Sequence, residues 1–426
     1  MTFTTTSEDS AHADSKITRR SWKMPIAFAL VSLISGVLFI GFAEDAPTGF
    51  DLSTSTDLFR LPVIQLPALA TGVVVTILMA LIAVGSAFMI SQDRKVPIWI
   101  PILGAVFALT GFLTWAAADA TLRVPELFAG ALVLAVPLVF GALGGVISER
   151  VGVVNIAIEA QLLAGAFVSA VVGTITASPF AGLAAAAVAG MLVSFLLSVF
   201  SIKYLVNQII VGVVINVLVS GLTGFLYSQW LAESPDQLNN PAGFSELPIP
   251  ILSSIPLIGP VLFKQTLIVY LLYVIVAAVA FAMYRTRWGL RLRAVGEHPK
   301  AADTVGINVT RTRFWNVALA GAIAGLGGAF ITLSQTGQFG KDVTAGAGFI
   351  ALAAVIFGRW DPIKATLAAL LFGFASNLQN ALSVVGSPVP SEFMLMLPYV
   401  VTIIAVAGLV GKSRPPAASG TPYIKG

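Results

Sequence analysis

The chain has 426 residues, of which 57% are hydrophobic and 10% are charged, whereas soluble domains contain roughly 25% charged residues. A soluble fold of this length could not shield so many apolar side chains from water, so the composition predicts a multi-pass membrane protein. The formal net charge of +4 is too small to indicate nucleic-acid binding. The chain has no cysteine, which excludes disulfides and thiolate metal sites. The two histidines, His12 and His298, are far apart in sequence and do not suggest a metal centre.

Apolar runs long enough to span a bilayer occur along the chain. A hydrocarbon core of about 30 Å needs roughly 20 helical residues, and eleven runs approach or exceed that length. A twelfth run, Gly346 to Phe357, has about half the length required. Backbone in lipid must satisfy its own hydrogen bonds, and the sequence lacks the alternating pattern of a barrel, so we expect an all-α fold with 11 to 12 transmembrane helices. The eleven longer runs are Pro25–Phe42, Leu66–Ile90, Pro97–Ala117, Pro125–Ile147, Ile156–Gly173, Phe180–Phe200, Ile209–Leu231, Thr266–Tyr284, Phe314–Leu333, Ala365–Leu382 and Phe393–Val410.

The distribution of Lys and Arg predicts the orientation of the chain. If all twelve runs cross from a cytoplasmic N-terminus, 20 of the 24 basic residues lie inside, and the other four are Arg60, Arg123, Lys264 and Lys341. A short run that enters and leaves on one side would place the basic C-terminal tail outside, which this bias disfavours. The number of crossings, 11 or 12, stays open at this point.

Both ends of the chain are expected in the cytoplasm, as a polar N-terminal tail at residues 1–24 and a C-terminal tail at residues 412–426. The apolar run after residue 24 could belong to a signal peptide. It is long for that role and no convincing cleavage site follows it, which favours an uncleaved first span.

The longest inner connection, residues 285–313, is strongly basic. It reads RTRWGLRLRAVGEHPKAADTVGINVTRTR and holds seven basic and two acidic residues. Pro299 to Val305 is rich in alanine, with Pro at the first turn and Gly306 just past the end, which predicts a short capped helix. A helix across the mouth of a bundle can act as a lever for a partner protein. The alternative is a basic loop that fixes topology and touches anionic lipid headgroups.

Four stretches carry a resemblance to a known family. They are SERVGVVNIAIEAQLLAGAF at Ser148–Phe167, GLRLRAVGEHPKAADTVGINV at Gly289–Val309, GAIAGLGGAFITLSQ at Gly321–Gln335 and TAGAGFIALAAVIFGRWDP at Thr344–Pro362. The second resembles the cytoplasmic coupling loop, related to the EAA loop, of permease subunits of ATP-binding-cassette (ABC) importers. The others resemble the branch of that superfamily, the branched-chain amino acid/ribose permeases, that carries simple sugars and nucleosides.

The resemblance covers residues 125–411, so the three helices expected within residues 25–120 are an addition outside it. One departure stands at Ala160, which follows Glu159 where the family usually has glycine. Glycine would permit closer packing of the backbone at this point than alanine does.

The resemblance implies a permease subunit of an ATP-driven importer in the prokaryotic plasma membrane. Such an importer combines two permease chains, with a heterodimer favoured, two cytoplasmic ATPase subunits and an extracytoplasmic substrate-binding protein. ATP and Mg²⁺ would be bound by the ATPase, with no cofactor in this chain: GLVGKS at Gly408–Ser413 lacks the first glycine of a phosphate-binding loop, where Val406 stands. The residues expected to couple to the ATPase are Arg291, Arg293, Gly296, Glu297, Pro299, Ala301, Ala302 and Gly306.

Polar side chains inside apolar runs are costly, so they mark candidate positions of a translocation pathway. Glu159 is the only carboxylate well inside a predicted span, and Asn155 would share its face on one helix. Alternatively, Asn155 caps a helix that begins there, and Glu159 stabilises the positive end of its dipole. The full candidate set is Asn155, Glu159, Asn216, Gln335, Phe339, Thr344, Gly346, Asn377 and Gln379, although amides at such positions can equally bridge helices.

The short run after Thr344 has the features of a broken transporter helix, with Thr344 and Gly346 at an N-terminus that would face substrate. NIAIEAQLLAGAF and TAGAGFIALAAVIF share a polar start that runs into small residues, a faint sign of an internal repeat. The glycine pairs Gly141/Gly145 and Gly321/Gly325 predict close helix packing.

The leading hypothesis is therefore the permease subunit of an ABC importer for nucleosides or related sugars. The main alternative is an ion-coupled secondary transporter of a small polar solute. Such a transporter would need an ion site in the membrane, for which Glu159 is the single candidate. It also leaves the basic loop unexplained. A membrane-embedded enzyme is disfavoured, because the sequence offers no paired carboxylates, metal cluster, or nucleophile with a base.

Overall fold

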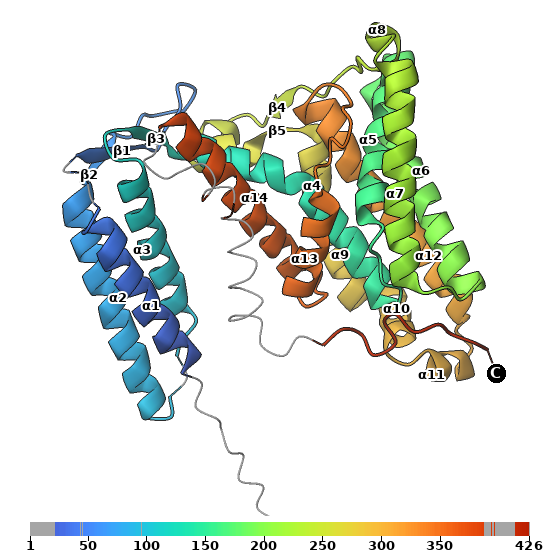
Figure 1. Ribbon diagram of the computed structural model, residues 1–426, viewed down its shortest axis with the longest axis horizontal. Helices are drawn as coiled ribbons and strands as arrows, with labels where there is room; N and C mark the ends of the chain where they lie inside the picture. The colour runs from blue at the N-terminus through green and yellow to red at the C-terminus, as the bar shows by residue number, and fades with distance from the viewer. Residues whose placement is uncertain are drawn as a thin grey trace, which may run out of the picture. The chain divides into compact units, whose positions relative to one another are not determined.

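Figure 1 shows the computed structural model of the chain, which describes residues 22–42, 44, 46–94, 96–386, 393, 396 and 414–425. Within these residues nine helices are long and apolar enough to cross a membrane, and two shorter apolar helices accompany them. The prediction of an all-α membrane fold is confirmed. The predicted span Phe393–Val410, apart from Phe393 and Met396, lies outside the described residues, as do Gly408–Ser413 and residues 1–21 of the N-terminal tail.

Among the described residues, those up to 48 and residues 65–119 form a first compact unit. Its helices are the predicted N-terminal spans, α1 (Lys23–Phe39), α2 (Ala68–Ser91) and α3 (Trp99–Ala116). They enclose a small core around Phe28, Phe39 and Met79. The hydroxyl of Thr48 donates a 2.6 Å hydrogen bond to the carbonyl of Thr114, which fixes the chain beside the end of α3.

The second unit, residues 49–64 and 120 onward, contains all four motif stretches. The helices α4 and α12 lie at its centre, because most of their residues are buried. Its long helices are α4 (Val124–Arg150), α5 (Ile158–Ile175), α6 (Pro179–Ser198), α7 (Gln208–Leu226), α9 (Leu267–Arg285), α12 (Val309–Phe330) and α14 (Pro362–Val384). Its shorter helices are α8 (Pro235–Leu238), α10 (Arg287–Glu297), α11 (Pro299–Thr304) and α13 (Ala347–Phe357).

Among the described residues, strands are confined to the connections. β1 (Pro47–Asp51) pairs in parallel with β3 (Thr121–Arg123), with Gly49 opposite Thr121. β4 (Glu246–Pro248) pairs antiparallel with β5 (Lys264–Thr266), and β2 is Ile64–Pro67. The helices α6, α7 and α12 continue into π-helical turns η1 (Val199–Lys203), η2 (Tyr227–Leu231) and η5 (Ile331–Gln335), and the remaining short turns are η3 (Leu252–Ser254) and η4 (Gly259–Phe263).

Glycines draw the core helices together. A side chain at Gly190 of α6 would collide with the carbonyl of Gly321, and one at Gly165 of α5 with the backbone of Gly325. Gly321 and Gly325 lie four residues apart on α12, so one face of that helix meets both neighbours at backbone distance. The predicted packing role of Gly321/Gly325 is confirmed.

Several connections meet at one end of the second unit, which we call the coupling end. The Arg150 side chain at the end of α4 donates a 2.7 Å hydrogen bond to the carbonyl of Trp360, between α13 and α14. The Tyr284 hydroxyl of α9 donates to Asp361 at 2.7 Å. Because α12 starts beside α11 at this end and α14 also starts here, residues 336–357 traverse the bundle from its opposite end (Figure 1).

Candidate functional site

Glu159 in the first turn of α5 reaches the start of α13. Its Oε1 accepts hydrogen bonds from the Thr344 hydroxyl at 2.6 Å and from the Gly346 N–H at 2.9 Å. Its Oε2 accepts from the Gly348 N–H at 2.6 Å. Amides in the first turn of a helix have no partner within that helix, and negative charge there is favoured by the helix dipole. The Glu159 carboxylate therefore caps α13 from a neighbouring helix.

The geometry of this cap depends on glycine. Gly346 precedes α13 with a φ of +81°, a left-handed conformation that favours glycine. A side chain at Gly348 would collide with the backbone of Glu159, so its absence lets the two helices meet. The 11 residues of α13 rise about 16 Å, roughly half of a hydrocarbon core of about 30 Å. The capped N-terminus thus lies about half a membrane thickness from the coupling end.

Asn216 on α7 caps the start of α5 in a similar way. Its Oδ1 accepts a 3.0 Å hydrogen bond from the Ala160 N–H, and its Nδ2 donates to the Ile156 carbonyl at 2.9 Å. Ala160, where the family usually has glycine, is fully buried. Two helices that share a polar start in the sequence, α5 and α13, are therefore both capped by side chains from other helices.

The expectation that Asn155 shares a helical face with Glu159, or caps that helix, was wrong. The helix begins at Ile158, and Asn155 lies in the irregular connection before it. The Asn155 amide exchanges hydrogen bonds of 3.1 and 3.2 Å with Gln161, which also donates to Ser194 at 2.9 Å. All three side chains are fully buried. Asn155 thus joins the connection to α5, and Gln161 extends the network to α6.

Phe339 and Gln335 do not meet Glu159 through any described contact. The Phe339 ring is 1% exposed and packs edge to face against Phe167, with centroids 5.2 Å apart. Its backbone is held by the Asn239 amide through hydrogen bonds of 2.7 and 2.9 Å. Gln335 is exposed at the end of η5. The Phe339 ring therefore stabilises the 336–346 segment and does not present an open aromatic surface.

Asn377 and Gln379 lie further along α14. The Asn377 amide donates a 2.7 Å hydrogen bond to the Leu127 carbonyl and so joins α14 to α4. Beside it is a hollow of about 520 Å³, to which Arg123 and Glu126 contribute an exposed ion pair of 3.1 Å. Gln379 is half-buried. Asn377 is thus a helix bridge at the edge of a polar hollow.

A polar strip remains accessible beside the Glu159 cap. It consists of Glu159, Asn216, Ser220 and Asp342, of which Asp342 is exposed and the other three are half-buried. Ser220 lies four residues after Asn216 on α7, hence on the same face, and its hydroxyl donates to Asp342 at 2.7 Å. Sequence reasoning missed Ser220 and Asp342, although an Asn and a Ser four residues apart in an apolar run were a signal.

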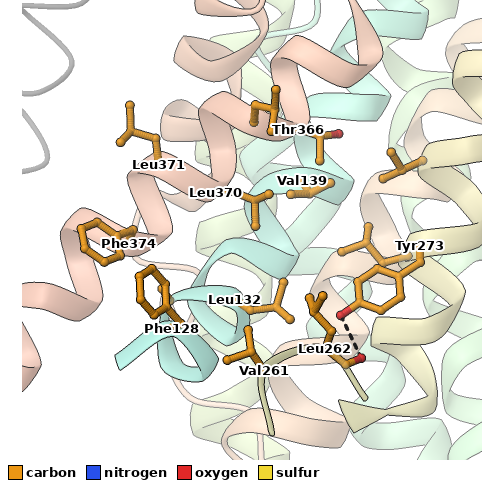
Figure 2. A pocket seen from close by; sticks show the side chains of 14 residues that line it. Phe128, Leu132, Val139, Val261, Leu262, Tyr273, Thr366, Leu370, Leu371 and Phe374 are labelled. Atoms are coloured by element: carbon orange, nitrogen blue, oxygen red, sulfur yellow. Dashed lines mark hydrogen bonds between the residues drawn. The ribbon is translucent and has the colours of Figure 1, made fainter. Parts of the chain in front are cut away.

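The large groove in Figure 2 has a different chemistry. It has a volume of about 630 Å³ and lies between α4, α9, α14 and η4. Its lining is apolar apart from the Thr366 hydroxyl and the Tyr273 hydroxyl, which donates to the Leu262 carbonyl at 3.5 Å. Such a surface suits lipid tails better than a polar solute. Within the part of the chain that the structure describes, no group of three or more His, Cys, Asp and Glu residues is placed to hold a metal ion.

At the coupling end, some of the expected coupling residues hold the loop itself. A side chain at Gly296 would collide with the Arg150 carbonyl, so α10 lies directly against the end of α4. Ala302 is buried, and Arg293 lies over the Tyr284 ring at 5.3 Å. The accessible members are Arg291, Glu297, Pro299, Ala301 and Gly306.

A second link at this end was missed by sequence reasoning. Glu149, 4% exposed, accepts a hydrogen bond from the Trp360 indole N–H. Arg359 and Trp360 have φ values of +54° and +55°, a strained conformation that costs about 1–3 kcal/mol per residue. Arg150 donates to both of their carbonyls. The signal was present, since both ends of this link lie in stretches that carry the family resemblance.

Comparisons with known proteins identify the family of the chain. Residues 127–406 match the family described as "Branched-chain amino acid transport system / permease component". The chain is 40% identical over 309 residues to the guanosine ABC transporter permease protein NupQ of Bacillus subtilis, covering 69% of this chain and 95% of NupQ. It is also 40% identical over 310 residues to the nucleoside ABC transporter permease protein NupC of Lactococcus lactis, covering 70% and 96%. A putative glucose ABC transporter permease of Haloferax volcanii, TsgC13, is 36% identical over 57% of this chain and 73% of its own. No solved structure was found to match.

Proposed function

Because the chain belongs to the permease family of branched-chain amino acid transport systems, we propose that it is the subunit of an ABC importer that carries nucleosides or related simple sugars across the plasma membrane of a prokaryote. The relatives named for guanosine and nucleosides support this substrate class, since the chain covers nearly their whole length. The three helices of the first unit precede the matched residues and are an accessory addition.

The polar strip is the proposed wall of the translocation pathway. Ionisable and polar groups at membrane depth face protein or water-filled cavities, because exposure to lipid is costly. Asn216, Ser220, Asp342 and Glu159 together offer donors and acceptors that suit ribose hydroxyls and base nitrogens. The strip is partly accessible in this chain, and a second permease would cover it. Bacillus subtilis has two guanosine permease proteins, NupQ and NupP, which supports a heterodimer.

The coupling end is proposed to face the cytoplasm and to dock a separate ATPase subunit that binds ATP and Mg²⁺. Among the exposed residues of α11 and its flank, Ala301, Val305 and Gly306 are small or apolar and permit close approach, and Lys300 and Thr304 add polar groups. An extracytoplasmic binding protein would deliver substrate at the opposite end.

One contact carries this proposal. Gly296 in the coupling loop lies against the Arg150 carbonyl and the Gly152 amide. Residues 151–157 lead from there into α5, where Glu159 caps α13. Movement of the loop by an ATPase would therefore reach the polar strip through seven connecting residues.

The docking role can be tested by Ala301→Arg on the exposed face of α11. We expect the ATPase to be lost from the purified complex and uptake to stop, while insertion of the chain is unchanged. Gln92→Arg, which adds the same charge at an exposed position outside the matched residues, is the control. Normal assembly and uptake in Ala301→Arg would remove the docking role.

A further inference from the structure

The C-terminal segment Arg414–Lys425 lies along the coupling loop (Figure 1, dark red beside α10 and α11). The Ala418 N–H donates a 2.9 Å hydrogen bond to the Gly296 carbonyl, and the Ala417 N–H donates to the Glu297 carboxylate at 3.1 Å. Ala418 is 6% exposed. This segment is therefore bonded to the last turn of α10, and we call it the strap.

The strap also supplies an acceptor to a buried cation. Arg313, in the second turn of α12, is 2% exposed, and its Nη1 donates to the Thr421 carbonyl at 2.9 Å. Its Nε and Nη2 have no hydrogen-bond partner among the described residues. A buried guanidinium is costly unless it is hydrogen-bonded. The strap thus provides one of the hydrogen bonds that the buried guanidinium on α12 needs.

A third set of contacts reaches the connection between α4 and α5. Gly152, with a φ of +92°, leaves room for both the Arg313 guanidinium and the Ala418 carbonyl, since a side chain there would meet both. Gly420 lies against Val154 in the same connection. The strap therefore touches the coupling loop, α12 and the connection that leads to Glu159.

Tyr423 adds a contact on α11. Its ring is half-buried against the core of the second unit. Desolvation, followed by a hydrogen bond to Asp303, raises the pKa of the Tyr423 hydroxyl, while the positive charge of Arg313 lowers it. The hydrogen bond to Asp303 joins the strap to α11.

We propose that the strap is a fixed tie that joins the coupling loop to the α4–α5 connection, so that both move together when an ATPase displaces the loop. This proposal rests on the proposed function for its consequence in transport. The composition of the strap suits a tie, because Pro415, Pro416 and Pro422 restrict the backbone and reduce the entropy lost on ordering.

The first experiment removes the strap by deleting residues from 414 onward in the full complex with ATPase, second permease and binding protein. We expect the ATPase to stay bound and to hydrolyse ATP, while nucleoside uptake falls at least tenfold. Wild-type uptake would overturn the proposal. Loss of the ATPase from the purified complex would also overturn it, because the strap would then be a docking surface.

A subtler variant guards against misfolding of the truncated chain. Ala418→Pro removes the N–H that donates to Gly296 and keeps the rest of the strap, and Ile424→Ala, at a side chain that is 68% exposed, is the matched control. In the purified chain alone we expect Ala418→Pro to speed hydrogen exchange in residues 287–304. Unchanged exchange would overturn the tie. This readout needs no partner, so it holds even if the proposed function fails.

A crosslink distinguishes a fixed tie from a latch that must release. The chain has no cysteine, so Val154→Cys with Gly420→Cys, whose side chains would lie in contact, gives a single possible disulfide between the α4–α5 connection and the strap. We expect the oxidised pair to retain uptake in the complex. Uptake that stops on oxidation and returns on reduction would overturn the fixed tie.

Discussion

The Glu159 carboxylate on α5 accepts a 2.6 Å hydrogen bond from the Gly348 N–H on α13, so a side chain of one helix caps the N-terminus of another. A carboxylate at membrane depth is expensive unless it is paired or hydrogen-bonded. Here both of its oxygens are bonded by protein donors. An ion-coupled transporter would need this carboxylate to bind an ion, whereas here it holds a half-helix in place.

Removing the Glu159 charge tests the cap. Glu159→Ala deletes three hydrogen bonds to a charged group, each worth about 1.5–3 kcal/mol, so we expect a lower thermal unfolding temperature and loss of uptake. Glu159→Gln keeps one acceptor oxygen, so it should lower the unfolding temperature and the uptake less than Glu159→Ala does. The measurement is thermal unfolding of the purified chain beside uptake in vesicles. Equal stability of both variants and the wild type would exclude the cap.

Gly348→Ala tests the approach of α5 and α13. The added methyl group meets the Glu159 backbone, and overpacking of this kind costs about 1–3 kcal/mol. Gly221→Ala on α7 is the matched control, because its position opens onto empty space. We expect Gly348→Ala alone to reduce thermal stability and uptake. If the two variants behave alike, the close approach has no role.

Asn216→Leu separates a cap from a substrate ligand. It removes both hydrogen bonds to the start of α5 and leaves a buried amide and carbonyl unpaired, at a cost of about 1–3 kcal/mol each. We expect reduced thermal stability even without substrate. Val217→Ala, at the exposed neighbouring position, is the control. A raised apparent KM with unchanged stability would instead make Asn216 a substrate ligand alone.

Arg150→Gln tests the link between the coupling loop and the strained turn after α13. It deletes charged hydrogen bonds to Trp360 and Arg359. We expect ATP hydrolysis by the complex to continue while uptake falls more than tenfold. Arg287→Gln, an exposed charge at the same end, should leave both unchanged. Normal uptake in Arg150→Gln would show that the bonds from α4 to this turn have no role in coupling.

The helices were predictable because bilayer thickness fixes their length. Every predicted apolar run within the described ranges is a helix, and α13 begins one residue after the predicted start at Gly346. Pro299 and Gly306 correctly predicted the limits of α11, since Pro is favoured in a first turn and Gly just after a last turn. These signals are local, so the sequence alone could reveal them.

The contacts of the site were harder to predict because they join distant residues. Asn155 looked like a cap by its residue type, but α5 takes its cap from Asn216, 60 residues beyond Ile156 in the chain. The Glu149–Trp360 bond and the strap on Gly296 likewise join segments that only the tertiary fold brings together. A side chain supplied from elsewhere removes the need for a local cap, and local patterns cannot report it.

Uptake of a radiolabelled nucleoside into proteoliposomes tests the account most directly. The vesicles would contain this chain with its ATPase, second permease and binding protein, and uptake would be measured with ATP, without ATP, and with a proton or sodium gradient alone. We predict uptake that requires ATP and the binding protein and that Glu159→Ala abolishes. Uptake by this chain alone, driven by an ion gradient without ATP, would contradict the account.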